Sequence, residues 1–194
     1  MDTAQAELAR RYFSWAAPAS LKHFRWFSGF TAANAKKAVA PLELVPLDGT
    51  DLLLPKDLAD EFDGFTVPSE PSYALLAGID GIHLLHREMS RLLDDADAGR
   101  PVPGGRAGET LGGQADPPTH LIVDRGRFAG LWEFDPETNK IVYQVFGDED
   151  DALREAVAET EEFVRDKLGD ARSFSLDSPK SRASRVADLK TSGH

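Results

Sequence analysis

Gly29 lies between two short segments with helical patterns, and this arrangement constrains the fold more than any other feature of the sequence. The segment before it, Leu21–Ser28, repeats apolar residues every three or four positions and follows Ser20, a good N-cap residue. The segment after it, from Ala32 to Val39 or Ala40, follows Thr31, a second candidate N-cap. Glycine readily adopts the left-handed conformation that ends a helix and turns the chain. The pattern predicts two helices joined by a tight turn.

The flanking residues extend this motif. A first helix is expected over Ala6–Trp15, with Leu8, Tyr12 and Trp15 on one face, and Pro18 ends it. After the third helix, two short apolar strands over residues 42–47 and 51–55 flank an Asp-Gly-Thr sequence that is typical of a hairpin turn. The order helix, helix, tight turn, helix and hairpin is that of a winged helix-turn-helix, which we place in residues 1–56.

The remainder of the chain mixes predicted strands and helices. Residues 57–118 are expected to form a connecting region with one helix, over about 82–93, and a Gly/Pro-rich loop over 99–118. Residues 119–194 predict a β-meander, a long helix and a basic tail. The strands are expected at His120–Val123, Arg127–Phe134 and Lys140–Phe146, the long helix from Asp148 to Leu168, and a short helix near Ser184–Lys190. The expected fold class is α+β, a winged helix-turn-helix followed by a small antiparallel β-sheet and helix domain.

Composition and charge exclude several classes of protein. The chain has no cysteine, which excludes disulfides and thiolate metal sites. Its start is polar and no apolar run approaches the roughly 20 residues of a membrane span, so we expect a cytoplasmic protein with no membrane partner. Residues 1–50 hold six basic and four acidic residues, residues 51–171 hold 11 and 27, and residues 172–194 hold five and two. A phosphate backbone would therefore meet the two ends of the chain and be repelled by the acidic middle.

The third helix has the composition of a recognition helix. Small and polar residues let a helix backbone approach base edges closely, and the residues of this kind are Ala33, Asn34, Lys36 and Lys37. Lys22 and Arg25 on the preceding helix are expected to hold phosphates, which positions a domain without specifying sequence. The basic tail adds second-rank candidates for DNA contact, Lys180, Arg182 and Arg185. The alternative is that the scaffold serves protein contacts or acts as a spacer, with Arg25 structural and Trp26 packed on the hairpin.

Two other groups of polar residues suggest chemistry only weakly. His83 and His86 are three apart on the helix predicted there, but no third ligand is evident, so we predict no metal. Glu133 and Asp135 resemble a carboxylate pair for acid–base catalysis, yet Glu133 is better interpreted as a solvent-side strand residue. The residues therefore predict no catalytic group and no cofactor.

The order of the segments resembles the AlkZ-like DNA glycosylase family. The resemblance spans nearly the whole chain and lies in Arg11-Tyr12-Phe13, in the stretch from Pro18 to Gly29, in the following helix with Lys36 and Lys37, and later in Val123–Arg127 and Gly130–Pro136. It implies tandem winged helices and excision of alkylated or cross-linked bases from DNA without a metal. In that family a short motif, with Gln or a related polar residue on each side of an apolar one, carries catalysis in the first winged helix.

That motif is not found here. The only glutamines are Gln5, Gln114 and Gln144, and none stands in such a motif, so the resemblance transfers no catalytic residue. We expect the chain to begin after the catalytic segment and to correspond to a DNA-binding, architectural half that is inactive alone.

Three functional hypotheses follow. The first is a module that binds double-stranded DNA and has no activity of its own. The second is a functional part of a DNA-repair glycosylase whose catalytic N-terminal winged-helix segment is missing from this sequence or is supplied by another chain. The third is a protein-interaction domain on a winged-helix scaffold, which the acidic middle favours.

Overall fold

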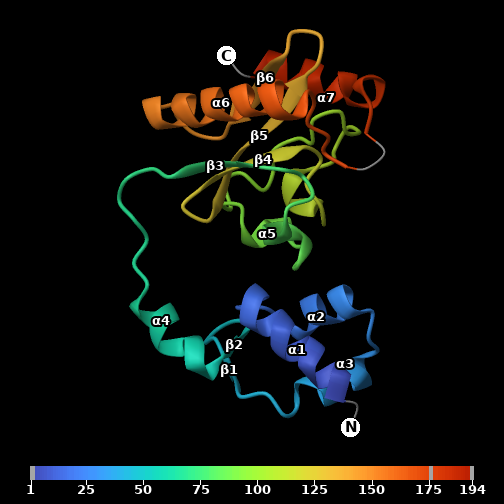
Figure 1. Cartoon of the computed structure of the whole chain (residues 1–194), viewed down its shortest axis with the longest axis vertical. Coiled ribbons are helices and arrows are strands. Elements are labelled where there is room, and N and C mark those ends of the chain that lie inside the picture. Colours follow the sequence, from blue (N-terminus) through green and yellow to red (C-terminus); the bar gives the residue numbers. More distant parts are fainter. Residues whose placement is uncertain (1–2, 175–176, 193–194) are drawn as a thin grey trace. The chain divides into compact units, whose positions relative to one another are not determined.

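The computed structural model describes residues 3–174 and 177–192, which form two compact units (Figure 1). Unit 1 comprises Met1–Val67 and Gly81–Arg87, and unit 2 comprises Pro68–Asp80 and Glu88–His194. No described helix is long and apolar enough to span a membrane.

Unit 1 consists mainly of three helices followed by a two-stranded hairpin. Its elements are α1 (Thr3–Ala16), α2 (Leu21–Ser28), α3 (Ala32–Val39), β1 (Leu44–Pro46), β2 (Leu53–Pro55), a 3-10 turn (Lys56–Leu58), α4 (Ala59–Gly64) and α5 (Gly81–Leu84). The strands pair antiparallel, with Val45 opposite Leu54. The bounds of α2 and α3 are those predicted from the caps and from Gly29.

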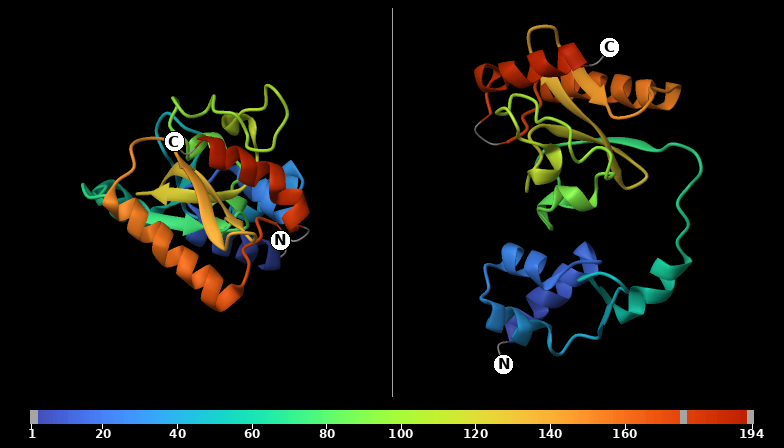
Figure 2. Two further views of the ribbon diagram at one scale, coloured as in Figure 1. Left: turned by 90° about the horizontal axis from the view of Figure 1, so that it is seen from above. Right: turned by 180° about the vertical axis from the view of Figure 1, so that it is seen from behind.

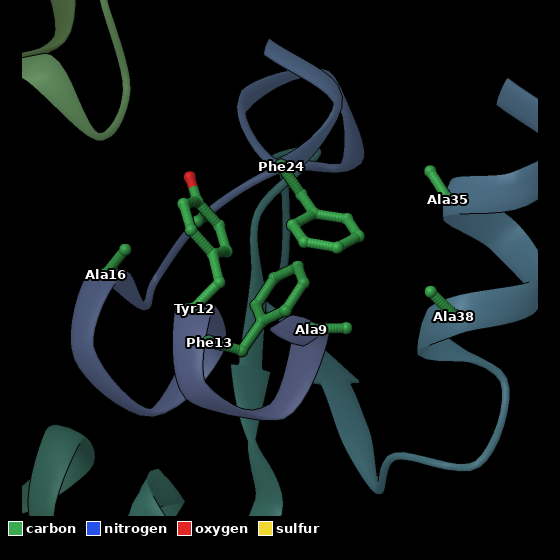
Figure 3. Packing of buried hydrophobic residues seen from close by; sticks show 8 residues of the cluster. Ala9, Tyr12, Phe13, Ala16, Phe24, Ala35 and Ala38 are labelled. Atoms are coloured by element: carbon green, nitrogen blue, oxygen red, sulfur yellow. The ribbon is translucent and has the colours of Figure 1, made fainter. Parts of the chain in front are cut away.

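Aromatic and alanine side chains fill the core of unit 1 (Figure 3). Phe13 from α1 and Phe24 from α2 are almost fully buried, with ring centroids 5.8 Å apart. The α3 helix contributes Ala35 and Ala38, each 1% exposed. Because these side chains are small, α3 lies close against the aromatic rings of the core.

The predicted inner face of α1 was partly wrong. Trp15 was expected on the buried stripe with Tyr12, but its side chain is 80% exposed, whereas Ala16 is 4% exposed. The residues of α1 that face the core are Ala9, Tyr12, Phe13 and Ala16. The small side chain of Ala16 therefore faces the core, and the large indole of Trp15 faces solvent.

Residues 81–87 pack on α1 and belong to unit 1. The Tyr12 hydroxyl donates to the Leu85 carbonyl at 2.7 Å, and His86 Nε2 lies 2.8 Å from the Ala16 carbonyl oxygen. The helix predicted over about 82–93 is therefore much shorter. It ends at Leu84, and Arg87, with φ 54°, turns the chain out of helical geometry.

Unit 2 is a four-stranded antiparallel sheet with helices on both faces. The strands follow the order β3 (Tyr73–Leu76), β4 (His120–Asp124), β5 (Arg127–Asp135) and β6 (Lys140–Val145). The helical elements are 3-10 turns at Met89–Arg91 and Leu111–Gly113, α6 (Asp151–Phe163) continued by a π-helical turn (Val164–Leu168), and α7 (Pro179–Ser192). The predicted meander corresponds to β4, β5 and β6, and β3 adds an edge strand.

The two long helices cover opposite faces of this sheet (Figure 2). Leu153 and Val157 of α6 pack in one cluster with Ile122, and Leu189 of α7 packs in the other with Leu121. Neighbouring residues of a strand point to opposite faces, so β4 contributes to both cores. The C-terminal segment is thus a packed helix along most of its length rather than a polar tail with a short helix.

Candidate nucleic-acid interface

The turn between α2 and α3 is fixed by local hydrogen bonds. Ser20 Oγ accepts from the His23 amide at 3.2 Å, and His23 Nδ1 accepts from the Ser20 amide at 3.1 Å. This reciprocal pair caps α2. Gly29 has φ 69°, and Thr31 Oγ1 then accepts from the Asn34 amide at 3.2 Å to cap α3. These contacts set the direction in which α3 presents its outer face.

That outer face carries the residues predicted for base contact. Ala33, Lys36 and Lys37 are exposed, and Asn34 is half-buried. The inner face carries the alanines of the core. On a helix with such short outer side chains at its start, the backbone can approach a surface closely, while the two lysines reach farther.

The stretch of sequence that contains this helix carries an excess of positive charge. No Asp or Glu occurs between residues 8 and 42, whereas six Lys and Arg do. The nearest preceding carboxylate, Glu7, accepts hydrogen bonds from Arg10 at 2.8 Å and Arg11 at 2.7 Å. These bonds lower the pKa of Glu7 to about 2, so it stays ionised and engages those two arginines.

The remaining cations lie on α2 and α3. Lys22 and Arg25 are exposed and three positions apart on α2. Within the described part of the chain, Arg25, Lys36 and Lys37 form no ion pair. The structure therefore brings the six candidates of the first unit together on two consecutive helices, and the cationic groups of Arg25, Lys36 and Lys37 are available to anions.

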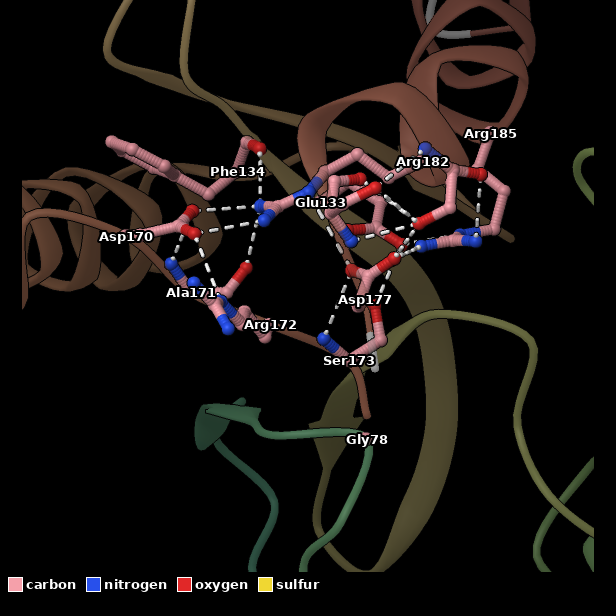
Figure 4. A network of polar contacts seen from close by, with 12 residues as sticks. Gly78, Glu133, Phe134, Asp170, Ala171, Arg172, Ser173, Asp177, Arg182 and Arg185 are labelled. Atoms are coloured by element: carbon pink, nitrogen blue, oxygen red, sulfur yellow. Dashed lines mark hydrogen bonds and ion pairs between the residues drawn. The ribbon is translucent and has the colours of Figure 1, made fainter. Parts of the chain in front are cut away.

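Two candidates from the C-terminal segment are placed differently (Figure 4). Arg182 is 0% exposed, and its Nη1 donates to Asp170 at 2.8 Å and to the Phe134 carbonyl at 3.2 Å. Arg185 is 9% exposed and donates to Glu133 at 2.7 Å and Asp177 at 2.9 Å. Both guanidinium groups pair with carboxylates inside unit 2, so the expectation that these arginines contact DNA does not fit this arrangement.

The same network corrects the interpretation of Glu133. Its side chain is 0% exposed rather than on the solvent side of the strand, and Oε1 also accepts from Ser173 Oγ at 2.8 Å. Burial raises the pKa of Glu133. Sequence alternation could not reveal this, because the covering residues lie 40 and 52 positions farther along the chain. Lys180, by contrast, is exposed on α7.

The residues considered for metal binding are placed within unit 1. His83 is 1% exposed, and His86 bonds to the first helix as described above. Among the described residues, no group of three or more His, Cys, Asp or Glu is arranged to hold a metal ion.

One surface feature was not found from the sequence. The alternative interpretation expected Trp26 to pack on the hairpin; its side chain is 54% exposed, and the Arg87 guanidinium lies 3.8 Å from the centroid of its ring. The two residues are too far apart in sequence for periodicity to connect them. The exposed indole itself could have been noticed, because it lies among the cations of α2.

The comparisons with known proteins agree with one another. A family model described as DNA glycosylase AlkZ-like matches residues 1–163. The solved structure of the Streptomyces sahachiroi DNA glycosylase AlkZ matches with a TM-score of 0.57 at 20% sequence identity, and this similarity concerns the fold. The match covers 84% of this chain but 42% of that one, so the chain spans less than half the length of that structure. No curated protein matches by sequence. With most of its length matched by the family model, the chain belongs to the AlkZ-like DNA glycosylase family.

Proposed function

We propose that this chain binds double-stranded DNA through a winged helix formed by unit 1, as the DNA-binding half of a DNA-repair glycosylase. In this proposal α3 lies in the major groove, where Ala33, Asn34, Lys36 and Lys37 face the base edges. Lys22 and Arg25 of α2 hold phosphates and set the orientation.

The observation that carries the proposal is the stretch without carboxylates. Residues 8–42 contain all of the proposed α2 and α3 contacts and no acidic residue, in a chain whose net charge is −11. Strong local charge separation of this kind favours a polyanion at one surface and disfavours it elsewhere. The alanine-rich inner face of α3 and the capped turn before it support a rigid presentation of that surface.

A salt titration of duplex binding tests this proposal. We expect the affinity of the full chain for a duplex to fall steeply as salt is added, because bound cations release counterions from DNA. Lys36→Glu plus Lys37→Glu should weaken binding, because it replaces two cations at the base edges with carboxylates. The slope of log Kd against log salt reports the phosphate contacts, of which Lys22 and Arg25 supply about two. The matched control is Lys140→Glu plus Lys167→Glu, which makes the same charge change at exposed lysines of unit 2.

The control decides what a loss of binding means. If both double variants bind equally weakly, only the total charge matters and the α3 surface is wrong. If the unaltered chain binds no duplex at low salt and associates with itself instead, the third hypothesis, a protein-interaction domain, replaces this one. Lys180 is a separate proposed phosphate contact on unit 2, and Lys180→Ala should lower the same slope by about one.

Catalysis is the second part of the proposal. The coverage of less than half of the AlkZ structure favours a chain that works with a catalytic winged-helix segment outside it. We expect no release of alkylated bases by these 194 residues alone, and release after that segment is added. Base release by the chain alone would show that the catalytic groups lie within it.

A further inference from the structure

The Trp26 indole on α2 is a large aromatic surface that remains open to solvent. The side chain is 54% exposed although the Arg87 guanidinium lies 3.8 Å from its ring centroid. A planar guanidinium at that distance covers one face of the ring and holds it through a cation–π contact. A ligand would therefore have to approach the opposite face or the edge of the ring.

The backbone at Arg87 supports a specific role for this contact. Arg87 has φ 54°, and its amide donates to the His83 carbonyl at 2.7 Å, as in the left-handed residue that ends a helix. Glycine is the usual residue at such a position because it carries no steric cost there. An arginine in this conformation places its side chain over Trp26, which a glycine could not do.

The charges beside Trp26 indicate what the indole would bind. Lys22 and Arg25 precede it by four and one positions, so on a helical wheel the three side chains share an arc of about 100°. Arg87 adds the cation that contacts the ring itself. Trp15 is more exposed, but Arg11, one turn before it, is bonded to Glu7, whereas Arg25 beside Trp26 forms no ion pair with the described residues. Stacking surfaces combined with cations are typical of proteins that bind unpaired nucleotides.

We propose that Trp26 stacks on an unpaired DNA base, on the ring face opposite Arg87, while Lys22 and Arg25 contact the adjacent phosphates. The base would then lie against an indole that is already fixed from behind. This inference extends the proposed function, because it specifies a DNA structure with an unpaired nucleotide and assigns a contact outside α3.

The test compares two duplexes of the same sequence, one fully paired and one with a single extrahelical nucleotide. Fluorescence anisotropy measures the affinity of the full chain for each. We expect the unaltered chain to bind the duplex with the extra nucleotide about tenfold more tightly than the paired duplex. In Trp26→Ala this preference should disappear. Trp26→Phe should retain much of it, because an aromatic face remains.

Two further variants separate stacking from folding. Arg87→Gly removes the guanidinium but keeps a residue that adopts positive φ without cost, so the preference should fall while the fold is retained. Trp15→Ala is the matched control and should change neither affinity. A 2-aminopurine at the extrahelical position should lose emission on binding to the unaltered chain but not to Trp26→Ala.

The outcomes distinguish this inference from the proposed function. Equal affinity of the unaltered chain for the two duplexes, or a preference that persists in Trp26→Ala, overturns the stacking site even if duplex binding is strong. A preference that depends on Trp15 rather than Trp26 also overturns it. The proposed function is judged separately, from the fully paired duplex and the Lys36→Glu plus Lys37→Glu variant.

Discussion

His120 at the start of β4 should make the stability of unit 2 depend on pH. Its side chain is 1% exposed and stacks on Trp132, with ring centroids 4.1 Å apart. Nδ1 accepts a hydrogen bond from the Gly78 amide at 2.9 Å, so the neutral ring carries its proton on Nε2. Burial disfavours the charged form and lowers the pKa of His120 to about 4.

The size and direction of the effect follow from the two pKa values. In the unfolded chain His120 takes up a proton below its ordinary pKa of about 6.5, whereas the folded protein does so only below about 4. Between these values the unfolded state binds more protons, so stability falls as the pH falls. Above about pH 6.5 the titration of His120 does not reduce the free energy of unfolding. By pH 4 it lowers the free energy of unfolding by about 3 kcal/mol.

Replacement of the imidazole isolates this contribution. His120→Gln removes the titrating group but keeps an oxygen that can accept the Gly78 hydrogen bond. The free energy of unfolding is measured by urea titration at several values from pH 7 to pH 4, with circular dichroism as the probe. The difference between the unaltered chain and the variant should narrow by about 3 kcal/mol across this range. A difference that stays constant with pH would refute the reasoning.

Two further predictions concern single positions. Arg182→Ala should lower the free energy of unfolding by about 3 kcal/mol, because it removes a fully buried side chain together with its bonds to the partly buried Asp170 and to the Phe134 carbonyl. Lys180→Ala on the exposed side of α7 should change it by less than about 0.5 kcal/mol, and equal melting temperatures of the two variants would contradict the buried network. Gly29→Ala should lower the free energy of unfolding by about 1 kcal/mol, because Gly29 has a φ of 69°. Gly64→Ala should leave it unchanged, because Gly64 has no positive φ and has open space around it. A thermal melt of each variant measures the difference.

Elements with local signals could be predicted from the sequence. The bounds of α2 and α3 follow from Ser20, Gly29 and Thr31, because caps and left-handed glycines act over three or four residues. The strands β4, β5 and β6 were found for a similar reason, through alternation and turn residues. The helix expected over about 82–93 was not found in that form, because contacts with α1 stop it early, and such contacts are invisible in a local pattern.

The candidate site shows the same division. Lys36 and Lys37 were placed on the outer face of α3 by helical periodicity alone. Arg182 and Arg185 could not be distinguished from surface cations, because their partners lie on β5 and in the segment before α7. Trp26 required a partner 61 positions away to be recognised as a fixed surface. Contacts between residues that are distant in the sequence therefore determine which charged side chains are buried and which remain exposed to a ligand.

The return of residues 81–87 to unit 1 has a consequence for any attempt to divide this protein. The Tyr12 hydroxyl and the Ala16 carbonyl find their partners in Leu85 and His86, which come after the chain has already contributed β3 to the other unit. A fragment that ends at Val67 would leave both groups without those partners and would remove the arginine that holds Trp26. Unit 1 is thus discontinuous in sequence, and no single cut or simple fusion can transfer it intact to another protein.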